Sequence, residues 1–315
     1  MDAAEPPAPA ARPRAAWVDV ARCFAMFPII WMHAGDAPAW SGRLVGGGLF
    51  LFFLLAGYFM PREPRPCCTR ALRLAGAWVL WSVIAALLYF AVAPEHGIDW
   101  RRVVGWGVNA YDTPLWFLRN LAVYELLIAA LLVLRLLPRY VWLLTAVLAS
   151  LAYAGSPAQQ LTIRFDWFWV TLLGFALRSV SVAQIETWLA RHAAVLAPAC
   201  VVVLCQPWLW SQYRADVGFC SLPTFSAAWC VLYFLAALAL QRFLPRAAAA
   251  LAFSGRGMMF CYVTHSFFLS PFYMGYDLNW GYNLWVPPLL LILLPLLGAG
   301  LQRLFPRAMR LLLAR

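Results

Sequence analysis

The feature that most restricts the fold of this chain is a series of long apolar segments. About ten can be distinguished, at residues 17–35, 46–60, 73–93, 115–134, 140–155, 166–178, 193–211, 222–241, 249–270 and 284–302. Most approach the ~20 residues that a helix needs to cross about 30 Å of hydrocarbon. Lipid leaves helices and closed barrels as the only spanning structures, because each backbone polar group must be paired internally. Continuous runs, unlike alternating segments of about ten residues, predict helices.

The composition agrees with an integral membrane protein that has little mass outside the bilayer. Apolar residues make up 64% of the 315 residues and charged residues 12%, whereas a soluble domain is roughly half apolar and about a quarter charged. We therefore expect an all-α, multi-pass bundle whose surroundings are the lipid bilayer. Residues 1–16 are rich in Ala and Pro and lack an apolar pattern, which predicts a disordered cytoplasmic tail before a single transmembrane domain at 17–315.

The arginines predict how the bundle is oriented. All 24 basic residues are arginine, and the net charge is +11. If the N-terminus is cytoplasmic and ten spans alternate, sixteen arginines fall inside and three fall in or beside spans. Five fall outside, namely Arg43, Arg101, Arg102, Arg164 and Arg214. This asymmetry predicts an even number of spans with both termini in the cytoplasm. It also explains the positive charge without nucleic acid, since no basic run outside the apolar segments carries interleaved aromatic residues.

Three ionisable residues stand in the first apolar segment, "DVARCFAMFPIIWMH". Asp19 lies one helical turn before Arg22, near enough to pair with it, and His33 follows Arg22 by eleven residues, which returns to nearly the same helix face. Charges inside a membrane usually mark pathways or sites, so this stripe is expected to line a polar cavity. The alternatives are an interfacial ion pair and a histidine that simply ends the helix. If His33 is functional, Asp36, three residues later, could orient its ring.

Six short motifs in order resemble the membrane acyltransferase-3 family, which comprises O-acetyltransferases of bacterial surface glycans. They are D-x-x-R-x10-H at 19–33, "GGGLFLFFLLAGYF" at 46–59, "RALR" at 70–73, "LWFL" at 115–118, "FWVTLLGFALR" at 168–178 and "CYVTHSFF" at 261–268. Two positions depart from the family pattern. The serine of the second motif is Ala56, and Leu121 stands where many members carry a glutamate, with Glu125 one turn later.

The resemblance implies roles for the charged residues. His33 would act as general base or as transient acyl acceptor, since the imidazole of histidine titrates near neutral pH. Asp19 and Arg22 would position it or shape the acyl path. Arg70 and Arg73, on the expected cytoplasmic side, would bind the phosphates of acyl-CoA. The alternative for these two arginines is topological anchoring.

Three further residues are candidates near the same site. His265 lies nearer mid-membrane than His33 and is a second candidate for acid–base work, with Tyr262 one turn before it. Tyr262 and Trp116 are candidate substrate contacts, although a tryptophan at this place can also serve as an interfacial anchor. No CxxC or Cys/His ligand spacing occurs, so no metal site is expected.

These features predict an O-acyltransferase of the inner membrane, most simply an O-acetyltransferase that uses acetyl-CoA. Its acceptor would be a cell-surface glycan or a lipid-linked saccharide. The alternative is a carrier or exporter without acyl-transfer chemistry, which should show paired broken helices in two related halves; the sequence has no such symmetry. The identity of the acceptor, the acyl chain length and the oligomeric state stay open at this point.

Overall fold

The computed structural model describes residues 15–33, 41–92, 94, 97–98, 113–137, 139–153, 165–210, 223–273 and 286–313. Within these residues the secondary structure is helical and no strand occurs. This confirms the all-α prediction for the part of the chain that is described. The expected tail at 1–16 falls on undescribed residues except for its last two, and Ala16 already begins the first helix. Asp36 also lies outside the described residues.

Twelve α-helices and two short 3₁₀ turns make up the described part. They are α1 (Ala16–His33), α2 (Ser41–Tyr58), α3 (Pro64–Val92), η2 (Thr113–Leu115), α5 (Trp116–Val133), α6 (Val141–Tyr153), η4 (Phe165–Trp167), α7 (Phe168–Leu177), α8 (Val182–Trp210), α9 (Pro223–Phe243), α10 (Pro245–Arg256), α11 (Met258–Tyr273), α12 (Val286–Leu304) and α13 (Pro306–Leu312).

Several helices carry the length and surface of membrane spans. Among the described residues, α3, α5, α8, α9 and α12 each contain a stretch long and apolar enough to cross a bilayer. Shorter apolar stretches occur in α2, α6, α7 and α11. Large apolar side chains are exposed on the outer faces of these helices, for example Leu72, Leu87, Trp142, Val195, Val202, Ile292 and Leu296. Soluble monomers rarely expose apolar surface on this scale, so the protein is a multi-pass membrane protein. The count of ten spans stays a prediction.

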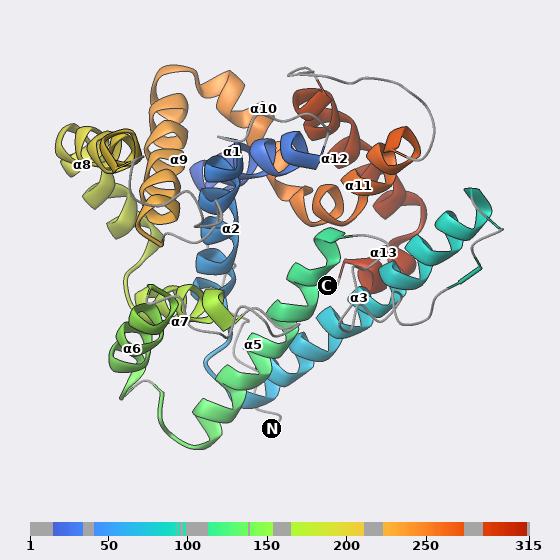
Figure 1. The fold of residues 1–315 in the computed structure, drawn as a ribbon, viewed down its shortest axis with the longest axis horizontal. Coiled ribbons are helices and arrows are strands. Elements are labelled where there is room, and N and C mark those ends of the chain that lie inside the picture. The colour runs from blue at the N-terminus through green and yellow to red at the C-terminus, as the bar shows by residue number, and fades with distance from the viewer. Residues whose placement is uncertain are drawn as a thin grey trace, which may run out of the picture.

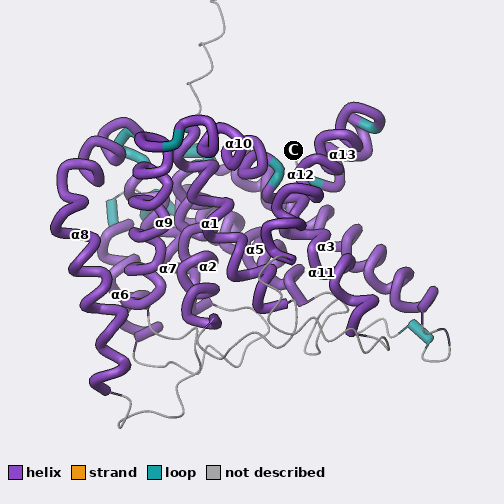
Figure 2. Tube along the Cα trace, turned by 90° about the horizontal axis from the view of Figure 1, so that it is seen from above, coloured by secondary structure: helices purple, strands orange, loops and turns teal. Residues whose placement is uncertain are grey.

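Helix α1 lies at the centre of the bundle, where it packs against α2, α9, α10, α11 and α12 (Figure 1). Helices α3 and α5 pack side by side along one edge, and α6 and α7 form a further pair. Figure 2 shows α10 and α13 at one end of the bundle. The ionisable residues of α1 are thus held among other helices, as the sequence predicted for a stripe that avoids lipid.

The structure differs from the expected segments in two places: segment 249–270 is divided into two helices, and the helix α13 follows α12. The apolar segment 249–270 is two helices, because α10 ends at Arg256 and α11 begins at Met258. Prolines start α10 and α13, where Pro245 and Pro306 occupy the first helical position and end the preceding helix. The residues before them, Leu244 and Phe305, are non-helical, as the ring of a following proline demands.

Two of the quoted motifs meet where α2 crosses α7. A Cβ atom on Gly57 would lie 1.9 Å from the backbone oxygen of Thr171, and one on Gly174 would lie 2.0 Å from that of Leu54. No larger side chain fits at either glycine without separating the helices. Small residues let membrane helices approach backbone to backbone, so the glycines of the second and fifth motifs form one helix–helix contact.

Candidate active site

His33 and His265 come together inside the bundle although 232 residues separate them. His33 ends α1, and His265 lies two turns into α11. Their rings form an edge-on contact with centroids 5.1 Å apart, and Nε2 of His265 lies 3.4 Å from Nδ1 of His33. His265 is completely buried. The two histidines that the sequence proposed separately are therefore one group, which we call the histidine pair.

The neighbours of the histidine pair assign the role of each ring nitrogen. Nδ1 of His33 lies 2.7 Å from the carbonyl oxygen of Ile29, and Nδ1 of His265 lies 2.7 Å from that of Tyr262. A carbonyl oxygen only accepts hydrogen bonds, so both Nδ1 atoms are assigned as donors. In a neutral imidazole the other nitrogen, Nε2, then accepts. Nε2 of His33 is thereby available as a proton acceptor, and Nε2 of His265 lies 3.4 Å from the Nδ1 that donates to Ile29.

Tyr262 of α11 lies beside His265, and Trp116 is the first residue of α5. The hydroxyl of Tyr262 donates to the carbonyl oxygen of Pro114 at 2.8 Å, and its ring centroid lies 5.9 Å from that of His265. It also contacts the ring of Phe117 at 5.0 Å. Trp116 is half-buried and its ring lies 6.3 Å from that of Phe117. Tyr262 thus ties α11 to α5 beside the histidines.

Asp19 and Arg22 form the ion pair that their spacing predicted, with 2.9 Å between Nη1 and Oδ1. Asp19 is 2% exposed, because α10 passes close to it: a Cβ atom on Gly255 would lie 2.0 Å from the Asp19 backbone oxygen. Eleven residues of helix, about 16 Å, separate Arg22 from His33. The ion pair is therefore remote from the histidine pair along α1, and its guanidinium lies 5.8 Å above the ring of Phe59 instead.

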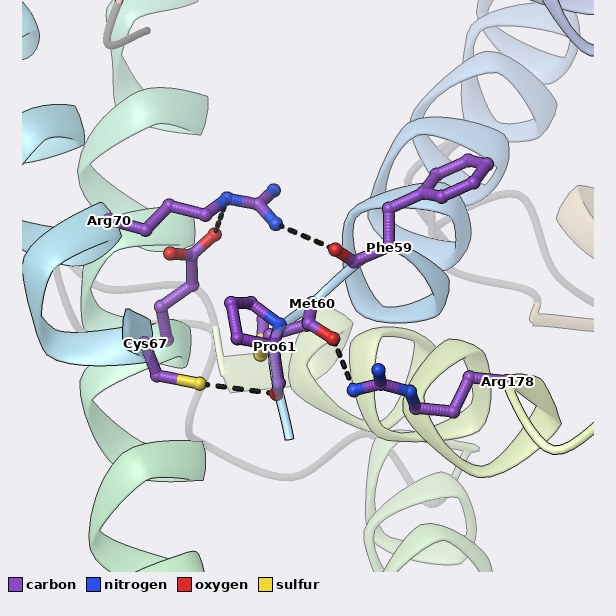
Figure 3. A network of polar contacts seen from close by, with 7 residues as sticks. Phe59, Met60, Pro61, Cys67, Arg70 and Arg178 are labelled. Carbon is purple, nitrogen blue, oxygen red and sulfur yellow. Dashed lines mark hydrogen bonds and ion pairs between the residues drawn. The ribbon is translucent and has the colours of Figure 1, made fainter. Parts of the chain in front are cut away.

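The turn after α2 is held by side chains from two other helices (Figure 3). Nη1 of Arg70 donates to the carbonyl oxygen of Phe59 at 3.2 Å, and the thiol of Cys67 donates to that of Pro61 at 3.3 Å. From the opposite side Arg178 donates to the carbonyl oxygen of Met60. With Arg22 over the ring of Phe59, three guanidinium groups converge on this turn. We call Arg22, Arg70 and Arg178 the arginine cluster.

The two arginines of the R-x-x-R motif differ in their surroundings. Nε of Arg70 lies 3.0 Å from Oε1 of Glu125 on α5, whose side chain is completely buried while that of Arg70 is 31% exposed. Arg73, one turn further along α3, is exposed and has no hydrogen bond or ion pair with a described residue. The carboxylate of α5 therefore pairs with an arginine of α3, and Arg73 is the member of the motif with a free guanidinium.

The histidine pair and the arginine cluster lie at different levels of α5. Phe117, near its start, contacts Tyr262 beside the histidines, whereas Glu125 pairs with Arg70. Eight residues separate these two positions, a rise of about 12 Å. Figure 1 shows α5 starting near α11 and running alongside α3. A donor with a charged end at the arginines and a reactive end at the histidines would have to span this distance.

Sequence reasoning gave no role to Glu125, Arg178 or Ser266. Glu125 is the only carboxylate in the apolar segment 115–134, and an intramembrane carboxylate is a site candidate by default, so the signal was present. Arg178 ends a motif quoted above. Ser266, whose Oγ lies 3.5 Å from Nε2 of His265, carried no sequence signal, because a serine in an apolar helix is common.

A known protein family matches the part of the chain that holds the residues described above. The family described as "Acyltransferase domain" matches residues 15–301, which include both members of the histidine pair and every residue of the arginine cluster. No curated protein and no solved structure matches the chain. The match covers most of the chain and begins within one residue of α1. The protein therefore belongs to the membrane acyltransferase-3 family.

Proposed function

We propose that this membrane acyltransferase moves an acyl group, most simply acetyl, from cytoplasmic acyl-CoA to a hydroxyl of a cell-surface glycan or lipid-linked sugar. The observation that carries the proposal is the buried contact between His33 and His265. Acyl transfer to a hydroxyl needs a group that takes the hydroxyl proton, or one that accepts the acyl group first. Nε2 of His33, left as an acceptor by the bond of Nδ1 to Ile29, suits either task.

In the direct route, Nε2 of His33 removes the proton of the acceptor hydroxyl as its oxygen attacks the thioester carbonyl carbon. The tetrahedral oxyanion then collapses, the carbon–sulfur bond breaks, and the thiolate of coenzyme A takes the proton from the imidazolium. While His33 is positively charged, its Nδ1–H donates to the carbonyl oxygen of Ile29, and the lone pair of His265 Nε2 lies 3.4 Å from the same Nδ1. His265 thus stabilises the charged base. In the covalent route the same nitrogen attacks the thioester carbonyl carbon and coenzyme A leaves as its thiolate. The acceptor hydroxyl then attacks the acyl group, the nitrogen–carbon bond breaks, and the hydroxyl proton passes to the thiolate.

The phosphates of the donor would bind at the arginine end of the bundle. Arg73 offers an exposed guanidinium, and Arg70 stands one turn before it on the same helix. Each charge-assisted contact contributes roughly 1.5–3 kcal/mol. The arginine asymmetry of the sequence supports a cytoplasmic position for this end and for both termini. The proposed location in the inner membrane follows from the family resemblance. A reporter fused after Arg315 should report the cytoplasm; an external signal would remove the donor from this face.

The test is thioester consumption by the purified protein in detergent, with acetyl-CoA as donor and free thiol as readout. His33→Ala should lower the rate by about 10²–10⁴ while the protein stays folded. His33→Gln tests the proton-accepting role, because glutamine can orient a substrate but cannot take a proton near neutral pH. The matched control is His192→Ala, since His192 is a partly exposed histidine of α8 outside the histidine pair.

Three results would change the conclusion. If His33→Gln keeps most of the activity, His33 only positions the substrate and His265 becomes the base. If His33→Ala keeps its activity, the histidine pair does not carry the chemistry. If the wild-type protein consumes no acyl thioester with any saccharide acceptor supplied, the carrier without acyl-transfer chemistry is the better description.

A further inference from the structure

Asn120, one turn into α5, is a buried amide that forms no hydrogen bond within the described part of the chain. Its side chain is 0% exposed, and neither Oδ1 nor Nδ2 has a partner. A buried polar group without a partner costs about 1–3 kcal/mol, and native proteins carry few of them. An amide that is unsatisfied at both atoms therefore indicates that something else completes its hydrogen bonds in the working protein.

Aromatic rings surround the position of Asn120. Phe117 and Tyr124 stand one turn before and one turn after it, on the same face of α5. Both rings contact the ring of Phe53 on α2, with centroids 4.6 Å and 5.5 Å apart. Trp167 stacks on the same ring at 5.8 Å. The face of α5 that carries Asn120 is thus directed at a region bounded by aromatic side chains.

This region holds further polar atoms that lack partners. Nε1 of Trp167 is buried and forms no hydrogen bond with a described residue. One turn later, the hydroxyl of Thr171 is also buried without a partner. These two groups belong to η4 and α7, and α7 contacts α5 through the rings of Phe168 and Tyr124. We name Asn120, Trp167 and Thr171 the amide site.

Along α5, the amide site lies between the histidine pair and the arginine cluster. Along α5, Phe117 contacts Tyr262 next to His265, Asn120 follows one turn later, and Glu125 pairs with Arg70 beyond it. Asn120 therefore lies at a level of α5 between the histidine pair and the arginine cluster. An elongated segment with hydrogen-bonding groups suits a site whose buried amide, indole N–H and hydroxyl lack partners.

We propose that Asn120 binds the amide-bearing arm of the acyl-CoA donor and so positions the thioester beside the histidine pair. The arm joins the phosphates of coenzyme A to the sulfur and carries secondary amides, each with one N–H and one C=O. The side chain of asparagine offers one acceptor and two donor hydrogens, which pair with both groups of such an amide. Trp167 Nε1 supplies a second donor to the same arm. This inference rests on the proposed function.

The test combines a protein variant with a shortened donor. Asn120→Leu replaces the amide by an apolar group of similar size, so the folded protein should become no less stable while the apparent KM for acetyl-CoA rises about ten- to thirtyfold. With the acetyl thioester of mercaptoethanol, which has no amide, the variant and the wild type should perform alike. Trp167→Phe keeps the ring and removes the donor, and should raise the KM for acetyl-CoA by about threefold to tenfold.

Ser82→Ala is the control, because Ser82 of α3 is also buried with an unpartnered hydroxyl but lies outside the amide site; its KM should stay unchanged. Equal KM values for acetyl-CoA in wild type and Asn120→Leu would overturn the inference while leaving the proposed function intact. A loss of stability in Asn120→Leu, with the same loss of activity toward both donors, would assign Asn120 to folding. Inactivity of the wild type toward every thioester would instead refute the proposed function.

Discussion

Replacing Arg70 with methionine should destabilise the protein more than replacing Glu125 with glutamine, although the two side chains share one ion pair. The reason is their unequal burial: the carboxylate of Glu125 is completely buried, whereas the side chain of Arg70 is 31% exposed. Without Arg70 a buried carboxylate loses its opposite charge. Without Glu125 the guanidinium keeps access to water and its bond to the carbonyl oxygen of Phe59.

The expected magnitudes follow from this asymmetry. Removing one member of a buried pair costs ~3–5 kcal/mol, which solvent at Arg70 reduces to about 2–3 kcal/mol. Glu125→Gln keeps an oxygen facing Arg70 and should cost about 0.5–1 kcal/mol. In the Glu125→Gln background, loss of Arg70 removes only its bond to Phe59, about 1 kcal/mol. The coupling energy of the double-mutant cycle should therefore be about 1.5 kcal/mol.

The assay is an equilibrium unfolding titration in mixed micelles, followed by tryptophan fluorescence. Arg62→Met is the control, because Arg62 lies exposed on the same turn and should change the free energy of unfolding by less than about 0.5 kcal/mol. A coupling energy of zero would show that the pair contributes nothing as a pair. A larger loss for Glu125→Gln than for Arg70→Met would refute the burial argument itself.

Three further outcomes follow from the structure. Gly255→Ala places a Cβ atom 2.0 Å from the Asp19 backbone oxygen, so the yield of monodisperse protein should fall sharply, whereas Gly300→Ala, with no heavy atom within 4 Å, should leave the yield unchanged. Arg73→Ala should raise the apparent KM for acyl-CoA at least about tenfold without altering the unfolding midpoint; an unchanged KM would reduce Arg73 to a topological charge. His265→Gln should lower kcat about 10²-fold, and full activity would mean that His33 works without it.

The candidate residues of the first helix illustrate what a local pattern can predict. The pairing of Asp19 with Arg22 depends on a spacing of one turn, so the sequence alone was sufficient to expect it. The contact between His33 and His265 joins two helices that are distant in the chain, and no periodicity within either helix contains it. Glu125 shows the same limit, since its partner Arg70 belongs to another helix.

Some helix boundaries can likewise be read from the sequence, whereas others depend on tertiary packing. Pro245 and Pro306 begin helices for a reason that is local and readable, because proline has a fixed φ and no N–H to donate. The break between α10 and α11 falls at Gly257 inside a continuous apolar segment. There a Cβ atom would meet Pro295 of α12 at 2.8 Å. That requirement arises from the neighbouring helix, so the apolar pattern could not reveal it.

The sequence by itself determined that this protein is helical and lies in a membrane, because long apolar runs can satisfy their backbone polar groups in lipid only as helices. It also determined the family, through motifs that follow one another in order along the chain. Only the tertiary structure decided which polar groups of the described residues come together, which are paired and which are left without partners. Those relations depend on how helices pack around α1, and helix packing is set by side chains far apart in the chain.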